Sequence, residues 1–465
     1  MIKLNYSSRR CSIVRDQSSL IIAIWINFYI AFLGYPILTF AQTLSYKDIK
    51  QLIEQEQLNC LDSLTKREKE LYYSPPELKL KYLLKAQQRI GVNLDIDSMR
   101  KQIKDQDAQS KKVSKYQDAI CFTILQGVLD DVLSVYNDLG GKAAIFRPHS
   151  ACSYCNDINA DVRNLEGEYV LFINHRTPTF CYQMTKAVIP IVNITTQDSS
   201  MFFSYTRSDL IQQIHKDSIL QNRFISLLEY FFTGKQFPDI IISSDYNNFL
   251  SSFTHFQEFF IVAHETIHAF EKHNVTQTFP LSGDDTLTKH DYLMLKKRLC
   301  ASWRNEFIAD YNAQKMLSYF CEKKNDTLFK ELNKLSGVLF LTYYDILKKV
   351  FYIHKYKSSQ PNLSSNDVKK IKLITDVVTS DSENDSLYYE IDNAWVNDDH
   401  PPFELRIQML SDEIIREASV NRKKGRISEE QYSFFLLGRN LIITMQTLYK
   451  VCENRLIEKI KNEKK

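Results

Sequence analysis

One short segment, residues 258–270, constrains the fold more than any other part of the chain. It reads EFFIVAHETIHAF, and the residues that flank its His264, Glu265 and His268 are largely apolar. The segment contains no Pro or Gly and predicts a buried helix, on which the two histidines lie one turn apart on the same face. Because two histidines and a glutamate are costly to bury without a role, these three residues are candidates for a functional site.

The spacing of these residues is typical of a metal site. Two imidazoles at positions i and i+4 of a helix can bind one zinc ion at about 2.0–2.1 Å. Glu265 directly follows the first candidate ligand, where a carboxylate can act as general base on a metal-bound water. The alternative interpretation is a pair of core histidines beside a surface glutamate.

A second segment supplies the third ligand that a zinc site with one open position needs. Residues 304–313 read RNEFIADYNA, so Glu306 and Asp310 lie at i and i+4 on one helical face. We expect Glu306 to be the third ligand. Asp310, one turn further on, can accept a hydrogen bond from Nδ1 of a zinc-binding histidine and so fix its tautomer.

A third segment, NDDHPPFELRIQML, places His400 before two prolines that hold it in a non-helical turn, with a helix starting near Pro402. His400 could donate a hydrogen bond to a developing oxyanion. Arg406, in the first turns of that helix, could organise carboxylates near the site. Taken alone, the segment is explained more simply as a helix-start turn with a surface histidine.

In this order, HExxH, ExxAD and HPPxxxRI, the three segments resemble the gluzincin class of zinc metallopeptidases. The pattern is similar to that of the CAAX-protease and heat-shock membrane-protease group and of the Lit-type phage-exclusion peptidases, over about residues 240–410. The resemblance implies a zinc metalloendopeptidase with one Zn²⁺ per chain, acting on a protein or peptide substrate. It implies the following roles: metal ligands His264, His268 and Glu306; catalytic residues Glu265 and His400; supporting residues Asp310 and Arg406.

The sequence also departs from these families. It lacks the several membrane spans of the CAAX-type enzymes, Lit-type proteins are not expected to carry its export signal, and its N-terminal helical region has no counterpart. A rival interpretation is an exported, non-catalytic zinc-binding interaction or immunity-like module. Glu265 separates the two, because a structural site has no need of a carboxylate there and would be closed by a fourth protein ligand.

The N-terminus predicts export. A basic stretch ends at Arg15, an apolar run extends from Leu20 to Phe40, and Thr39 and Ala41 offer small residues for cleavage after Ala41. The run also has the length of a membrane span, so residues 1–41 are either a signal peptide or an N-terminal membrane anchor. In both cases we expect the remainder to be periplasmic or secreted, with membrane contact possible through this segment.

Charge argues against nucleic acid as the main partner. The net charge of the chain is +3. Residues 1–41 contain four basic residues and one acidic residue, so their own charge of +3 accounts for the whole net charge. The rest of the chain is therefore formally neutral, whereas phosphate binding needs concentrated positive charge. The sequence leaves the oligomeric state open.

Composition and pattern predict an α+β, mostly α-helical fold. Only 11 Gly and 11 Pro occur, so helices should dominate. We expect a helical region over residues 42–141 and a zincin-like metallopeptidase domain over 142–465, with an HExxH helix and a small sheet. The helical region could be a pro-segment or a partner surface, although ordinary packing explains it more simply. Short apolar runs predict strands at Tyr169–Ile173, Ala187–Val192 and Ile240–Ile242.

Two further features have structural interpretations that are simpler than functional ones. His175 and Arg176 follow the first predicted strand and could line a cleft, but a histidine satisfied by local contacts is the preferred interpretation. Outside residues 1–41 the chain has eight cysteines, which permits disulfides in an exported protein. The lone CxxC of Cys152 and Cys155 lies in a polar context, so a small structural disulfide or free thiols are favoured over redox catalysis.

Overall fold

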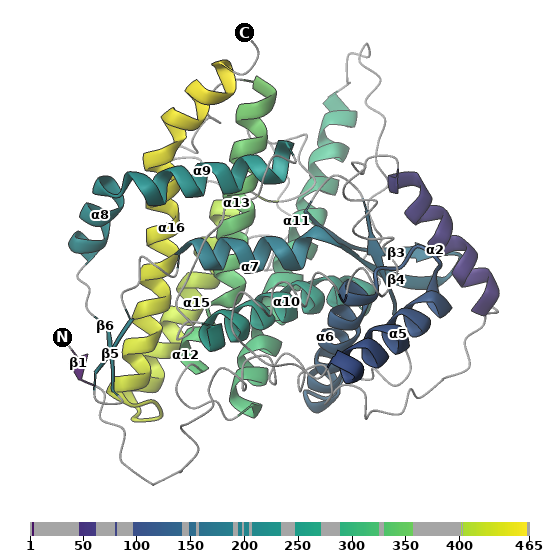
Figure 1. The fold of residues 1–465 in the computed structure, drawn as a ribbon, viewed down its shortest axis with the longest axis horizontal. Coiled ribbons are helices and arrows are strands. Elements are labelled where there is room, and N and C mark those ends of the chain that lie inside the picture. The colour runs from purple at the N-terminus through teal and green to yellow at the C-terminus, as the bar shows by residue number, and fades with distance from the viewer. Residues whose placement is uncertain are drawn as a thin grey trace. The chain divides into compact units, whose positions relative to one another are not determined.

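The computed structural model describes about three fifths of the chain, and this part is mostly helical with two small sheets (Figure 1). This confirms the predicted α+β, mostly α-helical class. The described residues are 2–3, 46–61, 80, 96–141, 148–154, 158–188, 194–197, 200–203, 207–233, 247–270, 289–324, 330–356, 401 and 403–462. The predicted signal or anchor segment, apart from residues 2–3, lies outside them, as do the predicted strand Ile240–Ile242, Cys155 and His400.

The chain divides into two compact units. The first comprises Met1–Asp209 and Glu229–Thr266, and the second Leu210–Leu228 and Ile267–Lys465. Along the chain, α8 (Arg207–Lys216), α9 (Ser218–Thr233) and α10 (Asn247–Phe270) each contribute residues to both units. The predicted domain boundary between residues 141 and 142 stays a prediction.

The first unit contains a three-stranded sheet of β2 (His149–Ser153), β4 (Glu168–Asn174) and β3 (Ala160–Leu165), in that order. β4 runs parallel to β2 and antiparallel to β3, pairing Ala160 with Ile173 and Leu165 with Glu168. Its position confirms the predicted strand Tyr169–Ile173. The β3–β4 turn consists of Glu166 and Gly167, both with positive φ (54° and 96°), as a tight two-residue hairpin requires.

Helices cover this sheet and extend the core of the first unit. On α2, Ile49 and Ile53 are buried against sheet residues Val170 and Phe172. Asp118 caps α6, since its carboxylate accepts a 2.7 Å hydrogen bond from the backbone N–H of Cys121. The helices of this unit are α2 (Tyr46–Leu61), α5 (Ile96–Val113), α6 (Ala119–Asp138), α7 (Arg176–Val188) and most of α10. A second sheet consists of β1 (Ile2–Lys3), β6 (Ser200–Phe203) and β5 (Ile194–Gln197), in that order.

Glutamine side chains line the outer edge of β2. Gln117 Oε1 accepts from Cys152 N at 2.9 Å, and Gln117 Nε2 donates to Ser150 O at 3.4 Å. Gln57 Nε2, from α2, donates to Cys152 O at 2.7 Å and to Gln117 Oε1 at 2.9 Å. These side-chain amides form hydrogen bonds with backbone groups of β2 that would otherwise pair with a neighbouring strand.

The second unit is helical. Most of α13 is buried, and it packs against α15 and α16. α15 is followed by Gly425 with φ 64°, and α16 starts with a capping box in which Ser428 and Gln431 each accept from the other's backbone N–H. The helices are α11 (Lys289–Lys323), α12 (Lys330–Asn333), α13 (Ser336–Tyr356), α15 (Phe403–Lys423) and α16 (Glu429–Asn462).

The structure corrects one predicted element. Ala187 and Val188, the first two residues of the predicted strand Ala187–Val192, instead end helix α7, while residues 189–192 lie outside the described part. Ala187 is buried in the last turn of α7, and periodicity alone does not distinguish a short apolar run at the end of a helix from a strand. None of the helices that the structure describes is long and apolar enough to cross a membrane.

The described cysteines include five free, buried thiols: Cys121, Cys152, Cys181, Cys321 and Cys452. Because Cys152 is free, the CxxC motif is not closed by a bond between its own two cysteines.

Candidate metal centre

Helix α10 presents the two histidines of the HExxH motif. Around them, Phe259, Phe260 and Val262 are almost completely buried, so apolar packing fixes the helix in place. The His264 and His268 side chains are themselves 8% and 12% exposed. The sequence therefore folds here as expected, into a buried helix with two imidazoles one turn apart.

Glu306 completes a cluster of three candidate metal ligands. One ligand atom from each of His264, His268 and Glu306 lies within 4.8 Å of the other two, and His268 Nε2 is 3.3 Å from Glu306 Oε1. Ligand atoms on a tetrahedral zinc ion with bonds of about 2.1 Å are about 3.4 Å apart. Two imidazole nitrogens and one carboxylate oxygen thus fit the donor set of zinc, and the three predicted ligands do converge. The identity of the metal stays a prediction.

Glu265 lies beside this cluster. Its Oε1 is 3.9 Å from His264 Nε2, and its side chain is 14% exposed. The carboxylate is therefore close to a candidate ligand and still accessible to a small molecule such as water. This is the placement that the predicted general base requires.

Arg406, on α15, holds two carboxylates of α11. Its guanidinium donates to both oxygens of Asp310 at 2.7 Å, and Nη1 lies 3.2 Å from Glu306 Oε2. A bidentate pair of this kind fixes geometry as well as charge. Arg406 thus contacts both carboxylates, and its role at a functional site stays a prediction. The hydrogen bond predicted between Asp310 and a histidine stays a prediction.

The charges of the site favour a divalent cation. Among the described residues of the site, the carboxylates of Glu265, Glu306 and Asp310 contribute −3 and Arg406 contributes +1, so these four side chains sum to −2. The Arg406, Asp310 and Glu306 side chains are only 5%, 2% and 11% exposed. Excess negative charge that is this deeply buried is costly, and a bound divalent cation would neutralise it.

Two other predicted residues have different outcomes. His400 lies outside the described residues, so its role stays a prediction. His175 is buried, with Nδ1 3.3 Å from Ser153 O, and Arg176 donates to Phe231 O at 2.8 Å. These local contacts confirm the structural interpretation of His175 and Arg176.

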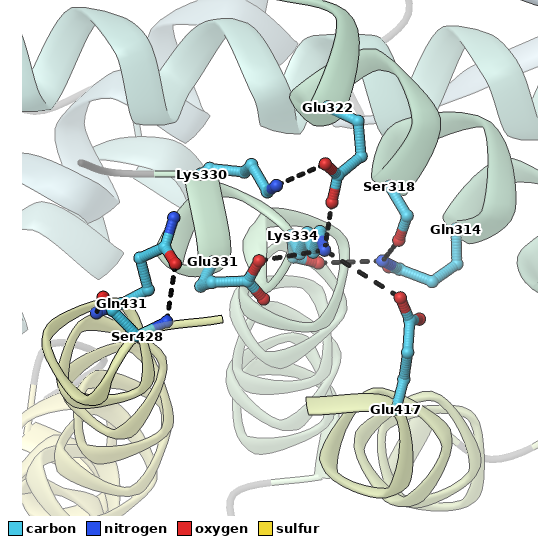
Figure 2. A network of polar contacts seen from close by, with 9 residues as sticks. All are labelled: Gln314, Ser318, Glu322, Lys330, Glu331, Lys334, Glu417, Ser428 and Gln431. Carbon is cyan, nitrogen blue, oxygen red and sulfur yellow. Dashed lines mark hydrogen bonds and ion pairs between the residues drawn. The ribbon is translucent and has the colours of Figure 1, made fainter. Parts of the chain in front are cut away.

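Sequence reasoning missed a second cluster of charges, which is centred on the buried Lys334 (Figure 2). Its ammonium is 2.8 Å from Glu322, 3.1 Å from Glu331 and 3.9 Å from Glu417, and Lys330 also contacts Glu322. The Lys334 side chain is 3% exposed. No motif marks these residues, and only their convergence from α11, α12 and α15 makes a cluster.

Sequence reasoning also missed Glu258, which lies six residues before His264 on α10. Burial raises the pKa of its carboxyl to about 8. The available signal was a single acidic residue at the start of the apolar run EFFIVA.

Comparison with known proteins found no matching protein-family model, curated protein or solved structure. The resemblance to gluzincins therefore rests on the three short segments and on the geometry of the residues they contain.

Proposed function

We propose that this protein is a zinc-dependent endopeptidase of a zincin-like type that hydrolyses peptide bonds of protein or peptide substrates. The observation that carries this proposal is the convergence of His264, His268 and Glu306 with Glu265 beside them. A site that only needed to hold a metal would gain nothing from a half-buried carboxylate next to its first ligand.

In the proposed mechanism, a zinc ion held by the three ligands would supply a water of lowered pKa and a positive charge for the carbonyl oxygen. Glu265 accepts the proton of the attacking water and passes it to the leaving amine. Arg406 keeps Glu306 in place and, with Asp310, fixes the face of α11 that carries it. His400 is the proposed hydrogen-bond donor to the oxyanion.

Location and partners follow from the sequence. We propose that the protein is exported and either secreted, periplasmic or anchored by residues 1–41, and that its partners are polypeptides rather than nucleic acids. Residues 142–465 are the proposed catalytic domain.

The test compares the zinc-loaded wild type with Glu265→Gln on a mixed peptide library. We expect the wild type to cleave, a chelator to abolish cleavage, and the variant to bind one zinc per chain without cleaving. Glu413→Gln, in an exposed pair with Arg416, is the matched control and should cleave normally. If the wild type binds zinc and cleaves nothing, the peptidase proposal is wrong, and the interaction-module alternative is favoured.

A further inference from the structure

The first turn of α15 is held against α13 by an aromatic contact. Phe403, the first residue of α15, is buried, and its ring centroid lies 5.0 Å from that of Tyr344 on α13. The ammonium of Lys348, one turn further along α13, lies 5.1 Å from the centroid of the same ring. A buried ring with an aromatic and a cationic neighbour has a narrow choice of positions.

An ion pair between the same two helices fixes the next residue of α15. Lys349 Nζ, on α13, lies 2.8 Å from Glu404 Oε1 on α15 and 2.7 Å from Asp345 Oδ2 on its own helix. Asp345 is buried and Lys349 is largely so, which means that solvent and salt screen this contact less than they screen a surface pair. Phe403 and Glu404, two consecutive residues of α15, are thus both tied to α13.

Arg406 extends these contacts to the candidate metal centre. Its guanidinium carbon lies 5.1 Å from the centroid of the Phe403 ring, to whose face a guanidinium is attracted. The guanidinium donates to both oxygens of Asp310 at 2.7 Å, and its Nη1 lies 3.2 Å from Oε2 of Glu306. The other oxygen of Glu306, Oε1, lies 3.3 Å from His268 Nε2. A continuous series of contacts therefore joins α13 to a candidate metal ligand, and all its members belong to the second unit.

The position of this guanidinium matters because it could compete with a metal ion. An arginine can bind one carboxylate through two parallel N–H···O bonds. Here Asp310 receives both of these bonds, and Glu306 is approached at one oxygen only. A shift of the guanidinium towards Glu306 would let it engage both oxygens of that residue, including the one that faces His268. The position of Arg406 therefore affects whether Glu306 Oε1 is left for a metal ion.

We infer that Phe403 is a positioning residue for the metal centre: its ring, fixed by α13, holds the guanidinium of Arg406 on Asp310 and so leaves Glu306 Oε1 for the metal ion. The inference rests on the metal-binding part of the proposed function. It goes beyond that function by giving α13, which supplies none of the three candidate ligands, an influence on metal affinity. A ring that served core packing alone would stabilise the fold and would not affect metal binding through Arg406.

The first arm of the test measures the zinc affinity of the full chain, by competition with a chromophoric chelator, beside the free energy of unfolding of the metal-free protein. Phe403→Leu keeps an apolar side chain but removes the ring, and we expect it to weaken zinc binding about 10–100-fold. Phe403→Tyr keeps the ring, so its zinc affinity should stay within about threefold of the wild type. Phe435→Leu, at a buried ring on α16, is the matched control and should lower stability without changing zinc affinity.

The second arm asks whether Phe403 acts through Arg406. Arg406→Lys keeps the charge but not the planar fork, and by itself should weaken zinc binding about tenfold. In that background we expect Phe403→Leu to have little further effect, whereas independent effects would multiply. Multiplied effects, or a zinc affinity in Phe403→Leu equal to that of the wild type, would overturn the inference. Tyr344→Leu, which frees the ring and should also weaken zinc binding, decides the question if Phe403→Leu does not fold.

The inference and the peptidase proposal can fail separately, because zinc affinity is measured without a substrate. If the substitutions affect zinc binding as expected and the wild type cleaves no peptide, the peptidase proposal is refuted and the role of Phe403 stands. Cleavage by the wild type, together with a zinc affinity that Phe403→Leu leaves unchanged, would do the reverse. A wild type that binds no zinc would overturn both.

Discussion

Two clusters of charge in the helical part of the protein each contain a buried cation, Lys334 in one and Arg406 in the other, and they differ in what lies at the centre. Around Lys334, the ammonium itself occupies the middle of the cluster, with the carboxylates of Glu322, Glu331 and Glu417 around it. At the candidate metal centre, Arg406 lies to the side and binds Asp310 and Glu306.

This difference separates a structural cluster from a site prepared for a ligand. In the Lys334 cluster, the lysine ammonium neutralises the carboxylates around it, so no added cation is needed. At the metal centre, the guanidinium binds both oxygens of Asp310 and lies 3.2 Å from Glu306 Oε2, while Glu306 Oε1 lies 3.3 Å from His268 Nε2. If this comparison holds, substitutions in the two clusters should affect stability alike and metal binding differently.

The largest expected effect is on metal binding. His268→Ala removes one of three ligands, so we expect zinc binding to fall from one ion per chain to none at micromolar zinc, with loss of any cleavage. Metal content after dialysis, measured by atomic spectroscopy, checks this. His215→Ala, in α8, is the matched histidine control and should retain the zinc. A full equivalent of zinc on His268→Ala would show that the metal binds elsewhere.

The next effect compares Arg406→Met with Lys334→Met. Arg406→Met leaves the buried carboxylates of Asp310 and Glu306 without their cation, and Lys334→Met does the same to the buried carboxylate of Glu331. We therefore expect each to lower the free energy of unfolding by about 3–5 kcal/mol. Arg406→Met should also weaken zinc binding about 10–100-fold, because Glu306 is no longer held. Lys334→Met should bind zinc as the wild type does.

Denaturant unfolding and zinc competition measure these two quantities, and Arg416→Met, in an exposed pair, should change neither. The comparison between the clusters fails if Lys334→Met weakens zinc binding as strongly as Arg406→Met does.

Glu258→Gln tests a third kind of buried charge, one with no partner. The pKa of Glu258 is raised from 4.5 to about 8, so between these pH values the folded protein holds a proton that the unfolded chain releases. Stability of the wild type should therefore fall as pH rises from 4.5 to 8 and level off above that.

The variant lacks this penalty. We expect its free energy of unfolding to exceed that of the wild type by a margin that grows across the same pH window and reaches a few kcal/mol, since one pKa unit is worth about 1.4 kcal/mol. Thermal unfolding at several pH values in amine-free buffer checks this. A margin that is constant with pH would mean that Glu258 ionises normally.

The smallest effect concerns the start of α16, which Ser428 caps (Figure 2). Ser428→Ala removes one hydrogen bond of the capping box and should cost about 1 kcal/mol. Zinc binding should remain unchanged, as for Lys334→Met. Chemical denaturation resolves a change of this size, and a loss above about 3 kcal/mol would show that the cap supports the charge cluster as well.

Local pattern predicted the elements that carry the candidate site. The helix around His264 and the helix around Glu306 follow from apolar spacing, and the strand Tyr169–Ile173 from its β-branched and aromatic residues. The role of Arg406 as an organiser of carboxylates could be predicted because it lies at the start of a helix that two prolines delimit. In each case the information lies within a few residues of the chain.

The features that could not be predicted depend on contacts between residues that are far apart in the sequence. Lys334 draws carboxylates from three helices, and no local pattern reveals that a lysine will be buried. Glu258 appears in the sequence as an ordinary acidic residue at the edge of an apolar run, and its raised pKa arises from walls supplied by α6 and α7. The wrong strand at Ala187–Val188 shows the same limit, since an apolar run that ends a helix resembles a short strand.

The glutamines on β2 have a consequence for how this protein behaves towards other chains. An exposed strand edge is a template on which further strands can add, which leads to aggregation or to unwanted partners. Because Gln117 and Gln57 occupy the backbone of β2 at Ser150 and Cys152, growth of the sheet from that side is blocked. Because both amides are buried, replacing them with apolar side chains would leave these backbone groups of β2 without partners and open the edge to other chains.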